Sequence, residues 1–329
     1  MSKPIRWGIL ATGGIAGTFV NGLRALPDAE VVAVGSRSRE SAEAFGAKFS
    51  IPRRHATYEA LAADPEVDVV YVASLHPWHK ENSILCLNHG KAVLCEKPFT
   101  VNAADAEAVI AVARRRKLFL MEAMWTRFLP MTVKVRQWIK DGVIGAPRFF
   151  QANFGFDVGE KPDGRHLKHA SGGGALLDVG VYTIAYAQMV FGCAPESVSG
   201  AALIGPTGVD EQAGALLRFP GGRIAQLSFA VRTNLGQAGT IYGTLGRIRL
   251  EPTFWRGSKM VLSVAGKPDE AVDLPPPGNG YTCEAAEVMR CLREGRLESD
   301  VMPLAETVSI LRTMDALRKP WGLRYPGEG

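Results

Sequence analysis

The chain has 329 residues, of which 47% are hydrophobic and 22% are charged, proportions typical of a folded globular protein rather than a disordered or fibrous one. Because domains usually contain roughly 100–200 residues, we expect two domains, each long enough to fold without disulfides or structural metals. The net charge of +5 is modest, and the densest basic run, at residues 114–117, is expected at a helix end, where cations are favoured. We therefore expect no nucleic-acid-binding surface.

Neither export nor membrane insertion is expected. No apolar run approaches the roughly 18 residues that a membrane span needs. The N-terminal residues lead directly into a predicted strand, which leaves no room for a signal peptide. The five cysteines form no CxxC pair, as is usual for reduced thiols in the cytoplasm. We therefore expect a cytoplasmic protein without a disulfide framework or a zinc site.

Strand-like and helix-like segments alternate along the first third of the chain. Short apolar, β-branched runs predict strands at residues 6–10, 31–34, 54–57, 67–73, 92–95 and 118–122. Helical patterns follow the glycine-rich stretch after residue 10 and occupy residues 41–49, 80–88 and 103–116. Such alternation predicts a doubly wound α/β domain with a parallel sheet, which we assign to residues 1–123.

The pattern changes in residues 124–329. A long strand is predicted at 147–156 and a helix at 174–191, followed by several strand-like runs between 196 and 273 that are separated by Gly and Pro. Two helices, at 283–294 and 304–317, close the chain. We expect an α+β domain with a large open antiparallel sheet. The final helices of this domain can pack back on the first domain.

The turn after the first predicted strand has the composition of a phosphate-binding loop. It is a variant of GxGxxG, with alanine at the first and third glycine positions. A side chain at Gly13 would keep the backbone away from a pyrophosphate, and the helix N-terminus behind it supplies free N–H groups. The residues expected to bind the cofactor here are Gly8, Ala11, Thr12, Gly13, Gly14, Ile15 and Ala16.

The end of the second predicted strand indicates which nicotinamide cofactor fits. NAD sites usually carry an acidic residue at this point, to bind the ribose 2′-hydroxyl. This chain instead has Ser36, Arg37 and Ser38, which suit a 2′-phosphate because guanidinium and hydroxyl groups donate hydrogen bonds to it. We therefore expect NADP to be favoured, with NAD possible.

Four blocks follow predicted strands or open a predicted helix. They are SLHPWH at 74–79, CEKP at 95–98, LMEAMWTRF at 120–128 and GGGALLDVGVY at 172–182. The Glu96-Lys97-Pro98 tripeptide and the order of the four blocks resemble the Gfo/Idh/MocA oxidoreductases. The resemblance covers essentially the whole chain and is greatest to the branch of dimeric dihydrodiol dehydrogenases, also described as NADP-dependent D-xylose dehydrogenases.

The resemblance implies a Rossmann domain, followed by an open sheet whose face builds a homodimer or homotetramer, and an active site between the domains. Ligands of open α/β sheets bind at the carboxyl ends of the strands, where the motifs of the first domain fall. The further cofactor-binding residues it implies are Ser74, Leu75, His76, His79, Glu96 and Lys97. His76 and His79 also have the spacing of a metal-binding pair, but no third ligand is evident, so no metal is expected.

Oxidation of an alcohol or hemiacetal needs a hydride acceptor, which NADP supplies, and a base for the hydroxyl proton. Lys97 aligns with the family's catalytic lysine. Asp178 and Tyr182 lie four residues apart on one helix face, at positions where many family members carry Asp and His. We expect Tyr182 to be the general acid/base, with Lys97 lowering its pKa and Asp178 as the orienting group. The roles of Lys97 and Tyr182 can be exchanged.

Trp125, Arg127 and Phe154 are expected to line the substrate pocket with Asp178 and Tyr182, although packing between domains is an equally good explanation for the first three. The expected substrate is a sugar or a cyclic vicinal diol. A ketosugar or anhydrosugar reductase would use the same residues, so it stays an alternative. A non-catalytic NADP-binding regulator would be expected to have lost Lys97 or Tyr182, and a glucose–fructose oxidoreductase to carry an export signal.

Overall fold

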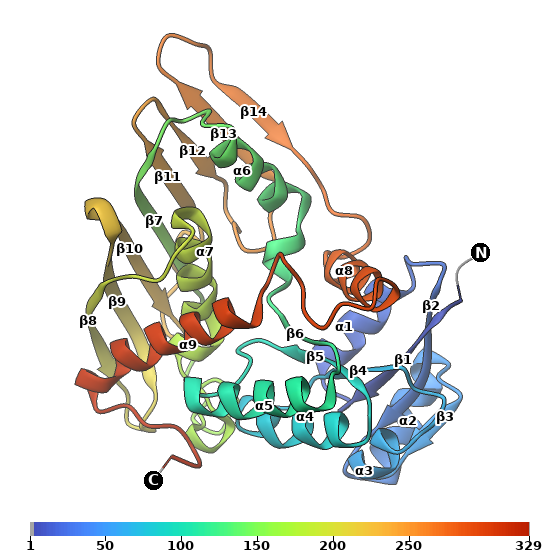
Figure 1. Cartoon of the computed structure of the whole chain (residues 1–329). Coiled ribbons are helices and arrows are strands. Elements are labelled where there is room, and N and C mark those ends of the chain that lie inside the picture. Colours follow the sequence, from blue (N-terminus) through green and yellow to red (C-terminus); the bar gives the residue numbers. More distant parts are fainter. Residues whose placement is uncertain (1–2, 329) are drawn as a thin grey trace. The chain divides into compact units, whose positions relative to one another are not determined.

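A computed structural model describes residues 3–328 of the chain (Figure 1). The chain divides into two compact units. Unit 1 runs to Phe128 and includes Pro277–Val308, whereas unit 2 contains Leu129–Pro276 and the chain from Ser309 onward. The division falls inside the last long helix, α9 (Leu304–Arg318), so both units contain part of it.

Unit 1 contains a parallel sheet with the strand order β3-β2-β1-β4-β5-β6. The strands are β1 (Ile5–Leu10), β2 (Ala29–Gly35), β3 (Arg53–His55), β4 (Val69–Val72), β5 (Ala92–Glu96) and β6 (Leu120–Ala123). Every residue of β4, β5 and β6 is buried, which explains their nearly continuous apolar sequence. The predicted α/β domain is confirmed, and its strand order reverses between β1 and β4, where open α/β sheets bind ligands.

The helices of unit 1 follow the predicted alternation. They are α1 (Gly14–Leu23), α2 (Arg39–Phe49), α3 (Tyr58–Ala62), α4 (His79–Asn88), α5 (Ala103–Arg116) and α8 (Tyr281–Arg293), with short 3₁₀ turns η1 (His76–Trp78) and η2 (Trp125–Phe128). The basic run lies at the end of α5, as expected. The short helix α3 is absent from the sequence-based expectation, because five residues are too few to display a helical period.

Unit 2 contains a second sheet with the strand order β14-β13-β12-β11-β7-β10-β9-β8. The strands are β7 (Pro147–Gly155), β8 (Ser197–Ile204), β9 (Asp210–Phe219), β10 (Arg223–Ala230), β11 (Gly239–Gly243), β12 (Gly246–Leu250), β13 (Lys259–Val264) and β14 (Glu270–Asp273). The expected α+β architecture is confirmed. The expected antiparallel sheet is mostly antiparallel, with one parallel pair, β7 and β10. No hairpin joins these two strands, so turn geometry does not impose an antiparallel arrangement on them.

The helices of unit 2 include one that the sequence pattern did not predict, α6 (Pro130–Lys140). The helix predicted at 174–191 begins later and has two parts, a π-helical turn η4 (Leu176–Gly180) and the α-helix α7 (Val181–Phe191). The stretch His169–Phe191 is long and apolar enough to cross a membrane by composition, contrary to our expectation that no such run exists. Because 94% of its most apolar 18-residue window is buried within the fold, it is a core helix.

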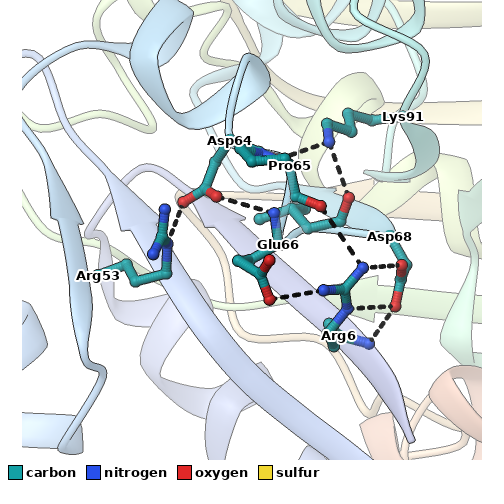
Figure 2. A network of polar contacts seen from close by, with 8 residues as sticks. Arg6, Arg53, Asp64, Pro65, Glu66, Asp68 and Lys91 are labelled. Carbon is teal, nitrogen blue, oxygen red and sulfur yellow. Dashed lines mark hydrogen bonds and ion pairs between the residues drawn. The ribbon is translucent and has the colours of Figure 1, made fainter. Parts of the chain in front are cut away.

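A network of polar contacts stabilises the edge of the unit 1 sheet where the strands begin (Figure 2). The Lys91 ammonium, just before β5, donates hydrogen bonds to the backbone carbonyl oxygens of Asp64 and Val67, at 2.5 and 2.9 Å. Arg6 of β1 donates from two guanidinium nitrogens to the Asp68 carboxylate. These contacts tie the loop before β4 to its neighbours, at the sheet edge opposite to the one where the sequence motifs lie.

Candidate functional site

A cavity of about 960 Å³ lies at the carboxyl ends of β1, β2 and β4 in unit 1. Of the residues expected to bind the cofactor, those that line it are Ala11, Thr12, Gly13, Ser36, Arg37, Ser38, Ser74 and Leu75. The parallel arrangement of the strands brings these side chains together from three separate segments of the chain. A volume of this size is within the range of small-molecule and cofactor sites.

The turn between β1 and α1 forms one wall of this cavity. Gly13 is the N-cap residue of α1 and has no side chain with which to cap the helix. A Cβ atom built on Gly13 or Gly14 would meet no protein atom within 4 Å, so the space in front of this backbone is open. Ala11 has a φ of +85°, a left-handed conformation that glycine adopts more readily than alanine. Residues held in such conformations cluster at ligand-binding sites, and the turn fits a pyrophosphate.

Ser36, Arg37 and Ser38 form the wall of the cavity beyond β2. Arg37 is exposed and lies close enough to Tyr58, a residue of α3 that also lines the cavity, for its charge to act on the Tyr58 phenol. Burial raises the pKa of Tyr58, and the charge of Arg37 opposes this increase. Tyr58 therefore stays neutral beside a cation near neutral pH. Arg37, with no acid before Glu40, therefore follows β2 at the point where NAD sites usually carry an acidic residue.

His79 joins the loops that follow β4 and β5. Its ring is completely buried, with Nε2 2.9 Å from the Ser74 carbonyl oxygen and Nδ1 2.8 Å from the Pro98 carbonyl oxygen. Burial lowers the pKa of His79. His76 is buried with its ring centroid 5.7 Å from that of His79. Neither histidine lines the cavity, and within residues 3–328 no cluster of three His, Cys, Asp or Glu side chains suits a metal ion.

The backbone at Lys97 is held by its neighbour in the tripeptide. Glu96 is 4% exposed, and its carboxylate accepts hydrogen bonds from the Tyr71 hydroxyl and, at 3.1 Å, from the Lys97 N–H. Lys97 itself is half-buried. Two positions further on, the Phe99 N–H donates to the buried Glu122 carboxylate at 3.1 Å. The loop that carries Lys97 is thus anchored at two points by buried carboxylates.

The other expected residues of unit 1 lie outside the cavity lining. Gly8 is buried in β1, where a Cβ atom would lie 2.9 Å from the Val67 side chain, so close packing requires glycine there. Ile15 and Ala16 belong to the first turn of α1. Trp125 is buried and stacks on Tyr281, with ring centroids 4.5 Å apart, and the buried Arg127 pairs with Glu306.

Unit 2 brings Asp178, Tyr182 and Phe154 to neighbouring positions. Tyr182 and Phe154 are both buried, and their ring centroids are 5.5 Å apart. Trp255 completes this aromatic group, with its ring 4.7 Å from Phe154 and 5.7 Å from Tyr182. Asp178, in the π-helical turn η4, receives a hydrogen bond from Arg165 at 3.1 Å.

Several residues of these arrangements were absent from the sequence-based expectation. In the cavity they include Ser41 and Tyr58, and in unit 2 they include Arg165, His166 and Trp255. His166 lies 3.5 Å from the Asp178 carboxylate. The signal that could have drawn attention to Arg165 and His166 is their adjacent basic side chains in a loop just before the glycine-rich block. Trp255 lies far from the quoted motifs and carries no local signal.

Both halves of the chain match domains of known proteins. Residues 5–124 match the domain described as "Oxidoreductase family, NAD-binding Rossmann fold", and residues 132–249 match the "GFO/IDH/MocA C-terminal domain". Trans-1,2-dihydrobenzene-1,2-diol dehydrogenase of Mus musculus is 40% identical over 335 residues, which cover 98% of each chain.

Solved structures of oxidoreductases share the fold over nearly the whole chain. A 3-ketoreductase from Actinomadura kijaniata, in complex with NADP and TDP-benzene, is 29% identical with a TM-score of 0.87, covering 96% of this chain and 98% of its own. The aldose-aldose oxidoreductase from Caulobacter crescentus, complexed with glycerol, is 25% identical with a TM-score of 0.88, covering 97% and 98%.

Proposed function

The chain belongs to the Gfo/Idh/MocA family of NAD(P)-dependent oxidoreductases, and we propose that it is an NADP-dependent dehydrogenase of sugars or cyclic vicinal diols. The observation that carries the choice of cofactor is the cavity wall of Ser36, Arg37 and Ser38, where NAD enzymes have an acid. The choice of substrate class rests on the full-length similarity to a trans-dihydrodiol dehydrogenase and on the sugar-converting structural relatives.

The residues of unit 1 fit an NADP molecule. The open backbone at Gly13 and Gly14 would hold the pyrophosphate, and Arg37 with its serine neighbours would hold the 2′-phosphate. When bound, NADP supplies the acceptor for a hydride in the oxidative direction and the hydride itself in the reductive one. Ser74 and Leu75 line the same cavity and would contact the cofactor beyond the pyrophosphate.

We assign proton transfer at the substrate hydroxyl to the Tyr182 phenol and electrostatic assistance to the Lys97 ammonium. A cation favours the phenolate over the neutral phenol, which raises the fraction of the tyrosine that is ionised and can accept a proton near neutral pH. Asp178 would accept a hydrogen bond from a substrate hydroxyl or orient a neighbouring donor. The loop anchors at Glu96 and Glu122 support this assignment, because they fix the backbone from which Lys97 projects.

The aromatic group of Phe154, Tyr182 and Trp255 supports the proposed substrate class. Aromatic faces bind the apolar faces of sugar rings and of cyclic diols, whereas charged groups bind their hydroxyls. The paired Asp178 and Arg165 supply such charged groups in the same unit.

The test is the initial rate of NADP⁺ and NAD⁺ reduction over a panel of aldoses, inositols and trans-dihydrodiols, with NADPH oxidation by ketosugars and anhydrosugars measured in parallel. We expect turnover of an aldose or a trans-diol with NADP⁺ preferred. Activity confined to the reductive panel would instead identify a ketosugar or anhydrosugar reductase, the alternative that the 3-ketoreductase neighbour favours. Tight NADP(H) binding with no turnover in either panel would contradict the proposal and favour a regulator.

Two pairs of variants test the residue assignments. Tyr182→Phe should remove most turnover and leave NADPH binding measurable, whereas Tyr186→Phe, one turn further along α7, should retain both. Arg37→Ala should weaken NADP binding by about 10- to 100-fold, the usual effect of losing a charge-assisted hydrogen bond, with little effect on NAD. Arg39→Ala, which removes an exposed arginine paired with Glu43, is the matched control. Near-normal turnover of Tyr182→Phe would refute the role of this tyrosine.

We also propose that the exposed face of the unit 2 sheet packs against a second copy of the chain. Leu203, Leu216 and Ile224 lie on this face and are 53%, 51% and 36% exposed. Apolar side chains clustered on one sheet face are typical of protein–protein interfaces. Light scattering should give the molar mass of a dimer or tetramer for the wild-type protein. The Leu216→Lys variant should have a lower molar mass, closer to that of a monomer. A monomeric wild-type protein at micromolar concentration would contradict this part of the proposal.

A further inference from the structure

A buried carboxylate lies at the start of the helix that carries the proposed catalytic tyrosine. Asp210 is the first residue of β9, is 0% exposed, and accepts a hydrogen bond at Oδ2 from the Leu176 N–H at 2.6 Å. Leu176 opens the π-helical turn η4, which contains Asp178 and continues into α7 at Val181. Asp210 therefore caps this turn from a strand that lies 34 residues further along the chain.

The chain just before the π-helical turn is shaped around this carboxylate. Gly174 has a φ of +115°, and a Cβ atom there would lie 2.1 Å from Asp210 Oδ1. No residue other than glycine fits both the conformation and the close approach. At the other end of the turn, the Thr183 hydroxyl donates to the Gly180 carbonyl oxygen at 2.9 Å, and a Cβ atom on Gly180 would lie 3.1 Å from the Phe229 ring. The turn is thus held at both ends.

Retaining a carboxyl group at this position destabilises the fold. Burial raises the pKa of Asp210 to about 7, although the N–H groups of Leu176, of Ala175 and of Asp210 itself favour the ionised form. A carboxyl group whose pKa is raised in the folded state lowers the stability of the fold once the pH rises above the pKa that this group has in the unfolded chain. An amide of the same shape would avoid this loss, but it has a single acceptor oxygen for these three N–H groups, so the aspartate is the stronger acceptor for the backbone of the turn.

We propose that Asp210 is a positioning residue, which fixes the backbone of the π-helical turn so that Asp178 and Tyr182 take the orientation that the reaction needs. The inference rests on the proposed roles of those two residues. π-Helical turns within α-helices are frequent at functional sites, because they change the direction of side chains relative to a regular helix. A displacement of about 1 Å at a reacting group can reduce turnover by about 100-fold.

The test compares Asp210→Ala, which removes the acceptor, with Asp210→Asn, which keeps it. Asp210→Ala should lower kcat by about 10- to 100-fold with the Kd for NADP unchanged, and Asp210→Asn, whose amide oxygen is a weaker acceptor than a carboxylate, should restore part of the turnover. Ile248→Ala is the control for lost stability, because Ile248 is fully buried in β12, which does not pair with β9. It should lower the melting temperature and leave kcat of the folded enzyme near its normal value.

A second measurement is independent of activity. Hydrogen exchange at residues 175–182 should accelerate in Asp210→Ala, and the part of the tryptophan emission that Trp255→Phe removes should change, because the Trp255 ring lies 5.7 Å from that of Tyr182. Unchanged exchange and emission would overturn the proposal, as would accelerated exchange with normal kcat, or an equal loss of kcat in the Ile248→Ala control. If Tyr182→Phe keeps its turnover while Asp210→Ala does not, the role of Tyr182 fails and the positioning of the turn stands.

Discussion

Replacing Glu122 by glutamine should make the protein more stable, and increasingly so as the pH rises. Glu122 lies in β6 and is fully buried, with Oε1 bound by the Phe99 N–H and Oε2 by the Thr307 hydroxyl at 2.9 Å. Burial raises its pKa from 4.5 to about 7, whereas these hydrogen bonds and the charge of Arg127 lower it. Glutamine keeps the acceptor for Phe99 and places an N–H group beside the Thr307 oxygen, so the packing is preserved.

The sign of the effect follows from proton binding. Because the pKa of Glu122 is higher in the folded than in the unfolded chain, the folded state holds the proton more tightly. The resulting stability is fully present below pH 4.5 and is lost as the pH rises through about 7. The whole effect is about 3 kcal/mol at 1.36 kcal/mol per pH unit, and about 2 kcal/mol of it falls between about pH 5.5 and about pH 8.5.

The assay is urea unfolding at these two pH values. Unfolding is monitored by hydrogen exchange in peptides that cover β5 and β6, which therefore report on unit 1. The stability of Glu122→Gln relative to wild type should rise by about 2 kcal/mol from the lower to the higher pH. Glu30→Gln, which changes an exposed carboxyl group of β2, should give a constant difference. If Glu122→Gln also gives a constant difference, Glu122 is ionised in the folded protein across this range and the reasoning is wrong.

Three further variants have expected outcomes. Lys91→Met removes the ammonium donor from the Val67 carbonyl and one of two donors from the Asp64 carbonyl, which the Val67 N–H still binds, so it should lower the free energy of unfolding by about 2 kcal/mol, measured with urea, without changing NADP affinity. Gly174→Ala should lower the melting temperature by several degrees, because its Cβ atom meets the Asp210 carboxylate; calorimetry checks this. Trp255→Ala removes the ring that stacks on Phe154, and steady-state kinetics should show a lower kcat/KM for cyclic substrates with an unchanged KM for NADP.

The fold of unit 1 could be predicted because its signals are local. Buried parallel strands are apolar along their length, and the helix from Ala103 to Arg116 is marked by the basic run at its end. The helix α6 was missed because the proline at its first position, Pro130, indicates a chain break as readily as a helix start. The parallel pairing of β7 and β10 had no local signal, since it depends on how distant strands meet.

The candidate site likewise contains residues whose positions could be predicted from the sequence and residues whose contacts could not. The cavity residues Gly13 and Arg37 follow strands whose direction the sequence determines, so their convergence could be predicted. The contact partners of the other expected residues could not be predicted, because these partners come from distant segments of the chain. Arg127 pairs with Glu306, which is 179 residues away, and Asp210 reaches Leu176 across 34 residues. Such contacts follow from tertiary packing, which no periodicity or motif encodes.

Two buried carboxyl groups with a raised pKa lie beside the proposed catalytic residues, one in each unit. Glu122 binds the N–H of Phe99, two residues after Lys97, and Asp210 binds the N–H of Leu176, two residues before Asp178. Burial raises the pKa of each to about 7, so each lowers stability above neutral pH. A neutral amide at either position would avoid this loss but is a weaker acceptor. The position of both carboxyl groups is explained if each is retained as a strong acceptor that holds the backbone of a catalytic segment in place. The protein is then less stable above neutral pH, but its catalytic residues are correctly oriented.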